Sequence, residues 1–164
     1  MRNHQRKRMC TALGLAGLIL TACGSPAPQP IVYGEDACHY CNMTIMERGF
    51  ACELVTTKGK VYKFDAIECL AAYRESGAID DSDVHSQWVS DYNNAGTLLN
   101  VDSATFIYSD DIRSPMAGGL CAVNDQDVAV RVRDVFKGRI VTWEEVRRIV
   151  ADKWNVTPAA DDGA

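Results

Sequence analysis

The chain has 164 residues, and its 22 Asp and Glu outnumber its 17 Lys and Arg, which gives a formal net charge of −5 at pH 7. This balance argues against nucleic acid as a partner, because the phosphate backbone is bound by basic surfaces. No long run of one sign stands out, so we expect most charged side chains to lie on a solvated face.

The first 22 residues are typical of a lipoprotein signal peptide. Four basic residues precede an apolar run that is too short for a permanent membrane span. The run ends in Leu20-Thr21-Ala22-Cys23, where a small residue precedes a cysteine that a peptidase can expose for acylation. We therefore expect residues 1–22 to be removed and Cys23 to be lipidated, and Gly24 favours the outer membrane. The alternatives are an uncleaved anchor helix and a plain signal peptide in which the cysteine occurs by chance.

Loss of residues 1–22 removes four of the 17 basic residues, which leaves 13 against 22 acidic residues and a formal charge of −9. Residues 23–30 are rich in proline and predict an extended tether. Residues 31–156 have a length suited to one modest core. Residues 157–164 are predicted to be a flexible acidic tail.

Cysteine usage in the mature chain does not fit a framework of disulfides alone. Once Cys23 carries lipid, five thiols remain, and an odd number leaves at least one of them unpaired. The five are Cys38, Cys41, Cys52, Cys69 and Cys121.

The first elements predicted after the tether are a hairpin and a helix. Residues 49–55 and 61–64 flank a polar turn and predict the hairpin. Asp65 stands at a predicted N-cap, with Glu68 three residues later, and the helical spacing continues to Gly77.

A second hairpin is predicted from residues 87–92 and 97–101, followed by a short strand at residues 105–108. Residues 102–104 echo Asp65-Ala66 at the end of the first hairpin, which suggests two related halves.

The last third of the chain alternates loop, helix and strand. Residues 114–121 predict a loop, residues 125–136 a helix and residues 139–141 a strand. Thr142 and Glu145 form a capping box for a final helix over residues 143–154. Together the elements predict an α+β fold with mainly antiparallel hairpins and about three helices.

Cys38-His39-Tyr40-Cys41 has a spacing shared by redox pairs and metal sites. A thioredoxin-type pair would start a helix after a strand, and that context is missing here. A zinc site would need a second pair of ligands, and the other cysteines are isolated in the sequence. Both alternatives stay open, since distant ligands can converge in the fold.

Met43 favours a third interpretation, a site for Cu(I). A thioether is a poor zinc ligand but a good ligand for Cu(I), which accepts two or three sulfur donors. In extended chain, Cys41 and Met43 would project to the same side and could hold one ion together.

Four blocks of the sequence resemble the NosL family, the lipoprotein copper chaperones of nitrous oxide reductase maturation. They follow the lipoprotein box in the family's order and extend to about Trp154. The blocks are residues 38–43 (CHYCNM), 62–69 (YKFDAIEC), 88–92 (WVSDY) and 114–119 (SPMAGG).

The resemblance implies a periplasmic, membrane-anchored carrier of Cu(I) rather than an enzyme. Its expected partners are an ABC-type membrane complex and the periplasmic component of that maturation machinery. The implied fold has two ββαβ halves, similar to the organomercurial lyase architecture. Matching the motifs residue by residue makes Cys41, Met43 and Met116 the expected copper ligands. From composition alone, we expect Gly118 and Gly119 to let the Met116 loop move during exchange.

This chain departs from the family pattern at His39 and Asn42, where many relatives have proline and glycine. His39 and Cys38 are therefore expected only as additional ligands. For Cys69, as for Cys52 and Cys121, packing in the core is the favoured role. The alternatives are a thiol-disulfide oxidoreductase that uses the CxxC pair, a structural-zinc lipoprotein, and a lyase built on Cys69, Cys121 and Asp65.

Overall fold

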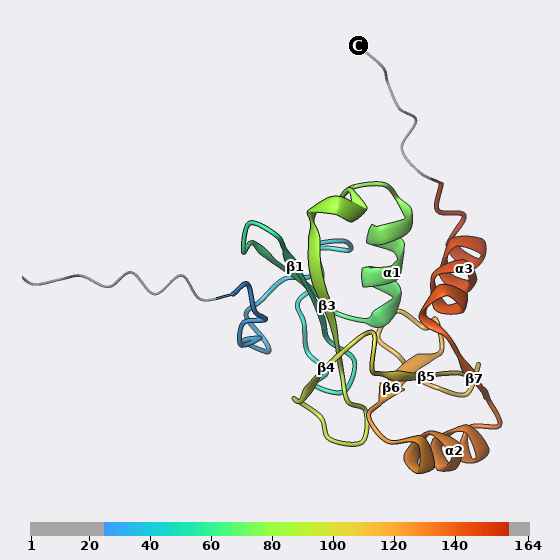
Figure 1. Ribbon diagram of the computed structural model, residues 1–164. Helices are drawn as coiled ribbons and strands as arrows, with labels where there is room; N and C mark the ends of the chain where they lie inside the picture. Colours follow the sequence, from blue (N-terminus) through green and yellow to red (C-terminus); the bar gives the residue numbers. More distant parts are fainter. Residues whose placement is uncertain (1–24, 158–164) are drawn as a thin grey trace, which may run out of the picture.

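The first sheet is built on the hairpin predicted near the start of the domain. In the computed structural model, which describes residues 25–157, β1 (Cys52–Thr56) pairs antiparallel with β2 (Val61–Phe64), as Figure 1 shows. Gly59 in the connecting turn has a φ of +79°, which a residue with a Cβ rarely adopts. The signal peptide, Cys23 and residues 158–164 lie outside the described residues, so the predictions about them remain predictions.

β1 is a central strand, because β3 (Val84–Ser90) pairs with its other edge. β4 (Leu98–Asn100) pairs in turn with β3, which confirms the second predicted hairpin and gives the order β2-β1-β3-β4. α1 (Ile67–Glu75) packs against β1 and β2. The short helix η1 (Asp81–Asp83) leads from α1 into β3.

The second sheet has β5 (Thr105–Tyr108) at its centre, between β6 (Leu120–Val123) and β7 (Arg139–Val141). Both neighbours run antiparallel to β5. α2 (Gln126–Val135) contacts all three strands, and the Asp125 side chain caps its first turn by accepting from the Val128 N–H.

The two sheets repeat one connectivity. β1-β2-α1-β3 and β5-β6-α2-β7 are both ββαβ units, and in each unit the first strand lies between the other two. This confirms the α+β class with two ββαβ halves. The second predicted hairpin does not open the second half, because β4 extends the first sheet. The strand predicted at residues 105–108 is confirmed as β5, and the second half begins with it.

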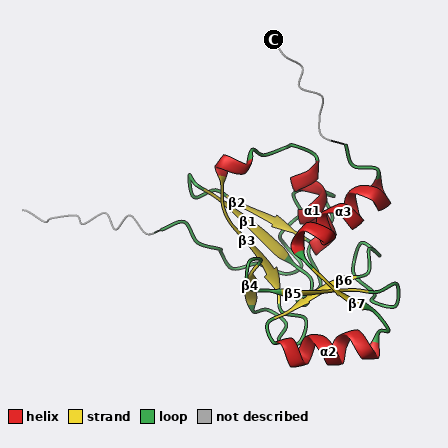
Figure 2. Cartoon of the chain, turned by 45° about the vertical axis from the view of Figure 1, so that its right-hand side comes forward, coloured by secondary structure: helices red, strands yellow, loops and turns green. Residues whose placement is uncertain are grey.

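α3 (Trp143–Trp154) joins the halves. Its predicted capping box is present, with Thr142 and Glu145 bonded to each other's backbone N–H groups. Both views place α3 beside α1, on the side of the molecule away from α2 (Figures 1 and 2). One hydrophobic core contains Leu70 of α1, Phe106 of β5 and Val146 of α3, so the two halves share it. No helix in residues 25–157 is long and apolar enough to cross a membrane.

Two local predictions were wrong. Ala66, with extended backbone, is the N-cap of α1, and no side chain caps this helix, so Asp65 does not have the predicted role. The predicted loop over residues 114–121 ends earlier, because Leu120 and Cys121 already belong to β6. Strand pairing with β5 decides this assignment, and such pairing is not visible in the local sequence.

Candidate metal centre

Three cysteines from two distant segments meet beneath the CxxC turn. The sulfur atoms of Cys38, Cys41 and Cys69 all lie within 4.8 Å of one another. Cys38 and Cys69 are buried, at 1% and 0% exposure, whereas Cys41 is half-buried. All three are free thiols, so the group can bind a metal ion without prior reduction.

The first two thiols are brought together by a tight turn. The N–H of Cys38 donates to the Met43 carbonyl at 2.8 Å, and the N–H of Asn42 donates to the Cys38 carbonyl at 2.9 Å. Asn42 has a φ of +60°, a left-handed conformation that asparagine tolerates better than most residues. The expectation of extended chain from Cys41 to Met43 was therefore wrong.

The third thiol comes from the start of α1. Cys69 lies in the first turn of this helix, which is buried from Ile67 to Arg74. On the other side, the N–H of His39 donates to the Lys63 carbonyl of β2 at 2.8 Å, which attaches the CxxC turn to the sheet edge. Because β2 leads directly into α1, both segments are positioned by the same strand.

Hydrogen bonding concentrates negative charge on one sulfur. The Cys69 thiol donates a hydrogen bond to Cys38, and this bond is the main reason that the pKa of Cys38 is lowered to about 5. Burial acts in the opposite direction and raises this pKa. The backbone N–H groups of Cys41, Asp65 and Tyr40 lower it further. The N–H of Cys41 lies 3.5 Å from the Cys38 sulfur. The same thiol contact raises the pKa of Cys69, and burial raises that of Cys41. In the metal-free site, hydrogen bonding thus favours the thiolate form at Cys38 over that at Cys69 or Cys41.

This donor set fits a soft ion of low coordination number. Within residues 25–157, no His, Asp or Glu joins the three sulfurs to make a fourth ligand. Structural zinc sites are almost always four-coordinate, whereas Cu(I) accepts two or three sulfur donors. Binding would release the protons held by Cys69 and Cys41, because the thiolate is the metal-ligating form.

The other ligands proposed from the sequence are not part of the three-cysteine group. The His39 ring packs on Tyr62 and Tyr73, with ring centroids 4.4 and 5.3 Å apart, and does not join the cysteine group. The Met43 side chain is 54% exposed. Met116 is half-buried and packs against the core that contains the site.

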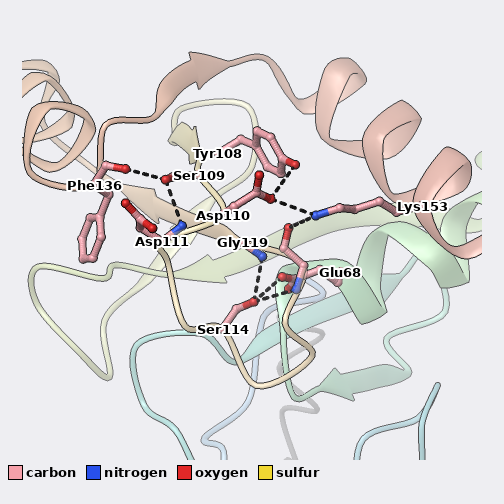
Figure 3. Close-up of polar contacts among 10 residues, drawn as sticks. Glu68, Tyr108, Ser109, Asp110, Asp111, Ser114, Gly119, Phe136 and Lys153 are labelled. Atoms are coloured by element: carbon pink, nitrogen blue, oxygen red, sulfur yellow. Dashed lines mark hydrogen bonds and ion pairs between the residues drawn. The ribbon is translucent and has the colours of Figure 1, made fainter.

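The Met116 loop is pinned to the residue next to Cys69 (Figure 3). The hydroxyl of Ser114 accepts from the N–H groups of Gly118 and Gly119, so its own proton is left to bond Glu68 Oε1. Glu68 is fully buried, and burial raises its pKa. A Cβ on Gly118 would lie 2.2 Å from Glu68 Cγ. Gly118 therefore permits close packing, a role different from the loop mobility expected of it.

Cys69 is the one member of the three-cysteine group that was not predicted from the sequence as a metal ligand. One available signal was its place in the block that ends FDAIEC, and packing was nevertheless the favoured role. Cys52 and Cys121 are buried in the core. Cys69, Cys121 and Asp65 do not form a cluster, so the geometry does not favour the lyase alternative.

Comparisons with known proteins agree with this fold. The sequence model of the NosL family matches residues 30–151, which is more than half of the chain. Among solved structures, the chain is similar to the copper chaperone NosL from Shewanella denitrificans, with a TM-score of 0.65 and 20% identity. That similarity covers 74% of this chain and 96% of the other. No curated protein matches the chain.

We predict that Cys69→Ala raises the pKa of Cys38 from about 5 toward its ordinary value of 9.0, because the variant lacks the thiol that donates to it. The ultraviolet absorbance of the thiolate, followed against pH in reduced, metal-free protein, measures this change. Cys121→Ala removes a buried thiol outside the group and serves as the control. An unchanged titration midpoint in Cys69→Ala would contradict the assigned hydrogen bond.

We also predict that Gly118→Ala destabilises the fold by about 1–3 kcal/mol, because the added methyl group overlaps buried Glu68. Urea unfolding measures this difference. Gly49→Ala is the matched control, since a Cβ at that position would meet its nearest atom at an ordinary 3.6 Å. Equal stability of the two variants would show that the 114–119 loop is not held as tightly as described.

Proposed function

Because the chain belongs to the NosL family, we propose that it is a copper chaperone that binds Cu(I) at Cys38, Cys41 and Cys69. The observation that carries this proposal is the convergence of three sulfur atoms within 4.8 Å, two buried and one reachable. Copper is the cargo of this site, and no step of the mechanism is catalytic.

The charge of the site supports a monovalent soft ion. The thiolate on Cys38 provides one negative charge that attracts Cu(I) before the other two thiols ionise. As the ion binds, Cys69 and Cys41 lose their protons to solvent or to a partner base. Two buried sulfurs then exclude water, which protects the ion from oxidation and from hard ligands.

Release by ligand exchange would begin at Cys41. This thiol is half-buried, so an incoming sulfur or imidazole ligand of a partner can approach the ion from its side. Displacement of Cys41 leaves two protein ligands, and a two-coordinate intermediate is acceptable for Cu(I). Met43, exposed two residues later, is a candidate ligand during this step, and Met116 is a candidate fourth donor.

The cellular setting follows from the leader and the family. We propose that the chain is periplasmic, anchored through lipid on Cys23, and delivers copper for the centres of nitrous oxide reductase. The recipient would be the maturation machinery, an ABC-type membrane complex with its periplasmic component. The family membership and the lipoprotein box support this placement.

A second candidate function is thiol-disulfide exchange. It is favoured by one observation, the low pKa of Cys38 beside two further thiols. In this reaction Cys41, the more accessible thiol, would pass its proton to Cys38 and attack a substrate disulfide, releasing one substrate thiol. Cys38 would then attack the Cys41 sulfur of the mixed disulfide, forming a Cys38–Cys41 bond and releasing the second substrate thiol. A measured reduction potential and turnover of a mixed disulfide would favour this function over copper transport.

The decisive experiment is a competition titration of the reduced mature chain with Cu(I) and a strong chelator. We expect Cys41→Ser and Cys69→Ser each to weaken binding by more than about tenfold, since even the outer partners of metal ligands contribute 10–100-fold. Met43→Leu and Met116→Leu test the thioether candidates. Met46→Leu is the control, because Met46 is 64% exposed and outside the motif.

X-ray absorption of the copper-loaded chain supplies the second readout. Three sulfur neighbours at low coordination number are expected from the geometry. Unchanged affinity in both cysteine variants would overturn the assigned ligands. Zinc with four sulfur neighbours in protein purified without added metal would overturn the copper function itself.

A further inference from the structure

The last turn of α3 lies over the CxxC turn. The Trp154 ring stacks on the Tyr40 ring, with centroids 6.1 Å apart and an interplanar angle of 19°. Tyr40 is one of the two residues between Cys38 and Cys41. Trp154 lies beyond residue 151, where the match to the family model ends, whereas Tyr40 lies within the matched region.

The same helical turn also holds the Met116 loop. The ammonium group of Lys153 lies 3.3 Å from Asp110 Oδ1 and 3.5 Å from the Gly118 carbonyl. It also lies 5.1 Å from the centre of the Tyr108 ring. Figure 3 shows the Lys153 side chain extending toward Asp110. Two consecutive residues of α3 therefore contact two different segments near Cys69. Lys153 contacts the Met116 loop, and Trp154 contacts the CxxC turn.

The end of α3 is well defined, which such a contact requires. Asn155 adopts a left-handed conformation with a φ of +51° and ends the helix. The N–H of Val156 then donates to the Ala151 carbonyl at 3.0 Å. The Val156 side chain packs against the core next to Trp154, so the turn is fastened on both sides of the tryptophan.

We propose that Trp154 is a positioning residue that controls access to Cys41 and, through it, the rate of copper exchange. The copper part of this inference rests on the proposed function. Trp154 acts through Tyr40: the stacked rings hold the CxxC turn against the last turn of α3, which itself packs beside α1. Attack on Cys41 by an incoming ligand is therefore slowed, whereas the equilibrium affinity is set by the cysteines themselves.

Loss of the stack should accelerate exchange by about two- to tenfold, the range that one aromatic pair supports. The first measurement is the rate of Cys41 alkylation by iodoacetamide in the metal-free, reduced mature chain, resolved by peptide mapping. The second is the rate at which the copper-loaded chain passes Cu(I) to an excess of chelator. Both are compared for wild type, Trp154→Ala and Trp154→Phe.

We expect Trp154→Ala to be faster in both measurements, with an affinity within about twofold of wild type, and Trp154→Phe to restore slow rates because it can stack. Lys153→Met keeps the stack and should accelerate Cys41 alkylation less. Fully buried Cys121 is the internal control for global opening. A mere loss of stability would speed the alkylation of Cys121 in the same proportion as that of Cys41.

Two results would overturn the inference: an unchanged rate of Cys41 alkylation in Trp154→Ala, or an equal rise at Cys121. Failure of the wild-type chain to bind Cu(I) is a separate result. It would overturn the proposed function and the copper part of the inference, while the alkylation rates would still decide whether Trp154 controls access to Cys41.

Discussion

The site depends on the contact between the Cys38 and Cys69 sulfurs. It joins a turn near the start of the domain to the first turn of α1, and the hydrogen bond from Cys69 lowers the pKa of Cys38. Without α1 in its place, Cys38 and Cys41 would have no third sulfur beside them. With it, they become two sides of a three-sulfur site, and the burial of Cys38 and Cys69 leaves Cys41 as the accessible side.

The rest of the fold holds these two segments in register. Lys63 of β2 accepts the His39 N–H through its carbonyl, and its ammonium group bonds the Pro30 carbonyl at 2.8 Å and Asp36 at 2.6 Å. One residue of an edge strand thus fastens the segment that carries the CxxC turn. The hydrogen bond between Ser114 and Glu68 holds the Met116 loop against α1. The end of α3 contacts both the CxxC turn and the Met116 loop. The site is therefore assembled by packing among several elements and is not contained in one motif.

Local patterns in the sequence predicted most of the elements. The hairpin around Gly59 and the helix capped by Thr142 form as expected, because turn residues and capping boxes act within a few positions. The predictions that were wrong concern residues whose structure is decided by contacts between distant segments. β6 follows a glycine-rich loop and exists because Leu120–Val123 pairs with β5. Asp65 would cap an isolated helix, yet its side chain is buried and does not cap α1, and burial raises its pKa.

The sequence by itself determined the lipoprotein leader pattern and the family, because these depend on residue types at short, fixed spacings. Of the three sulfur ligands now proposed, it named Cys41 as an expected ligand and Cys38 as an additional one. Only the tertiary structure decided that Cys69 completes the group, while Met43 points largely into solvent. The reason is geometric. Spacing along the chain constrains a turn such as Cys38–Cys41, whereas the meeting of that turn with α1 is decided by how the helix packs on the sheet and by which strand holds the turn in place.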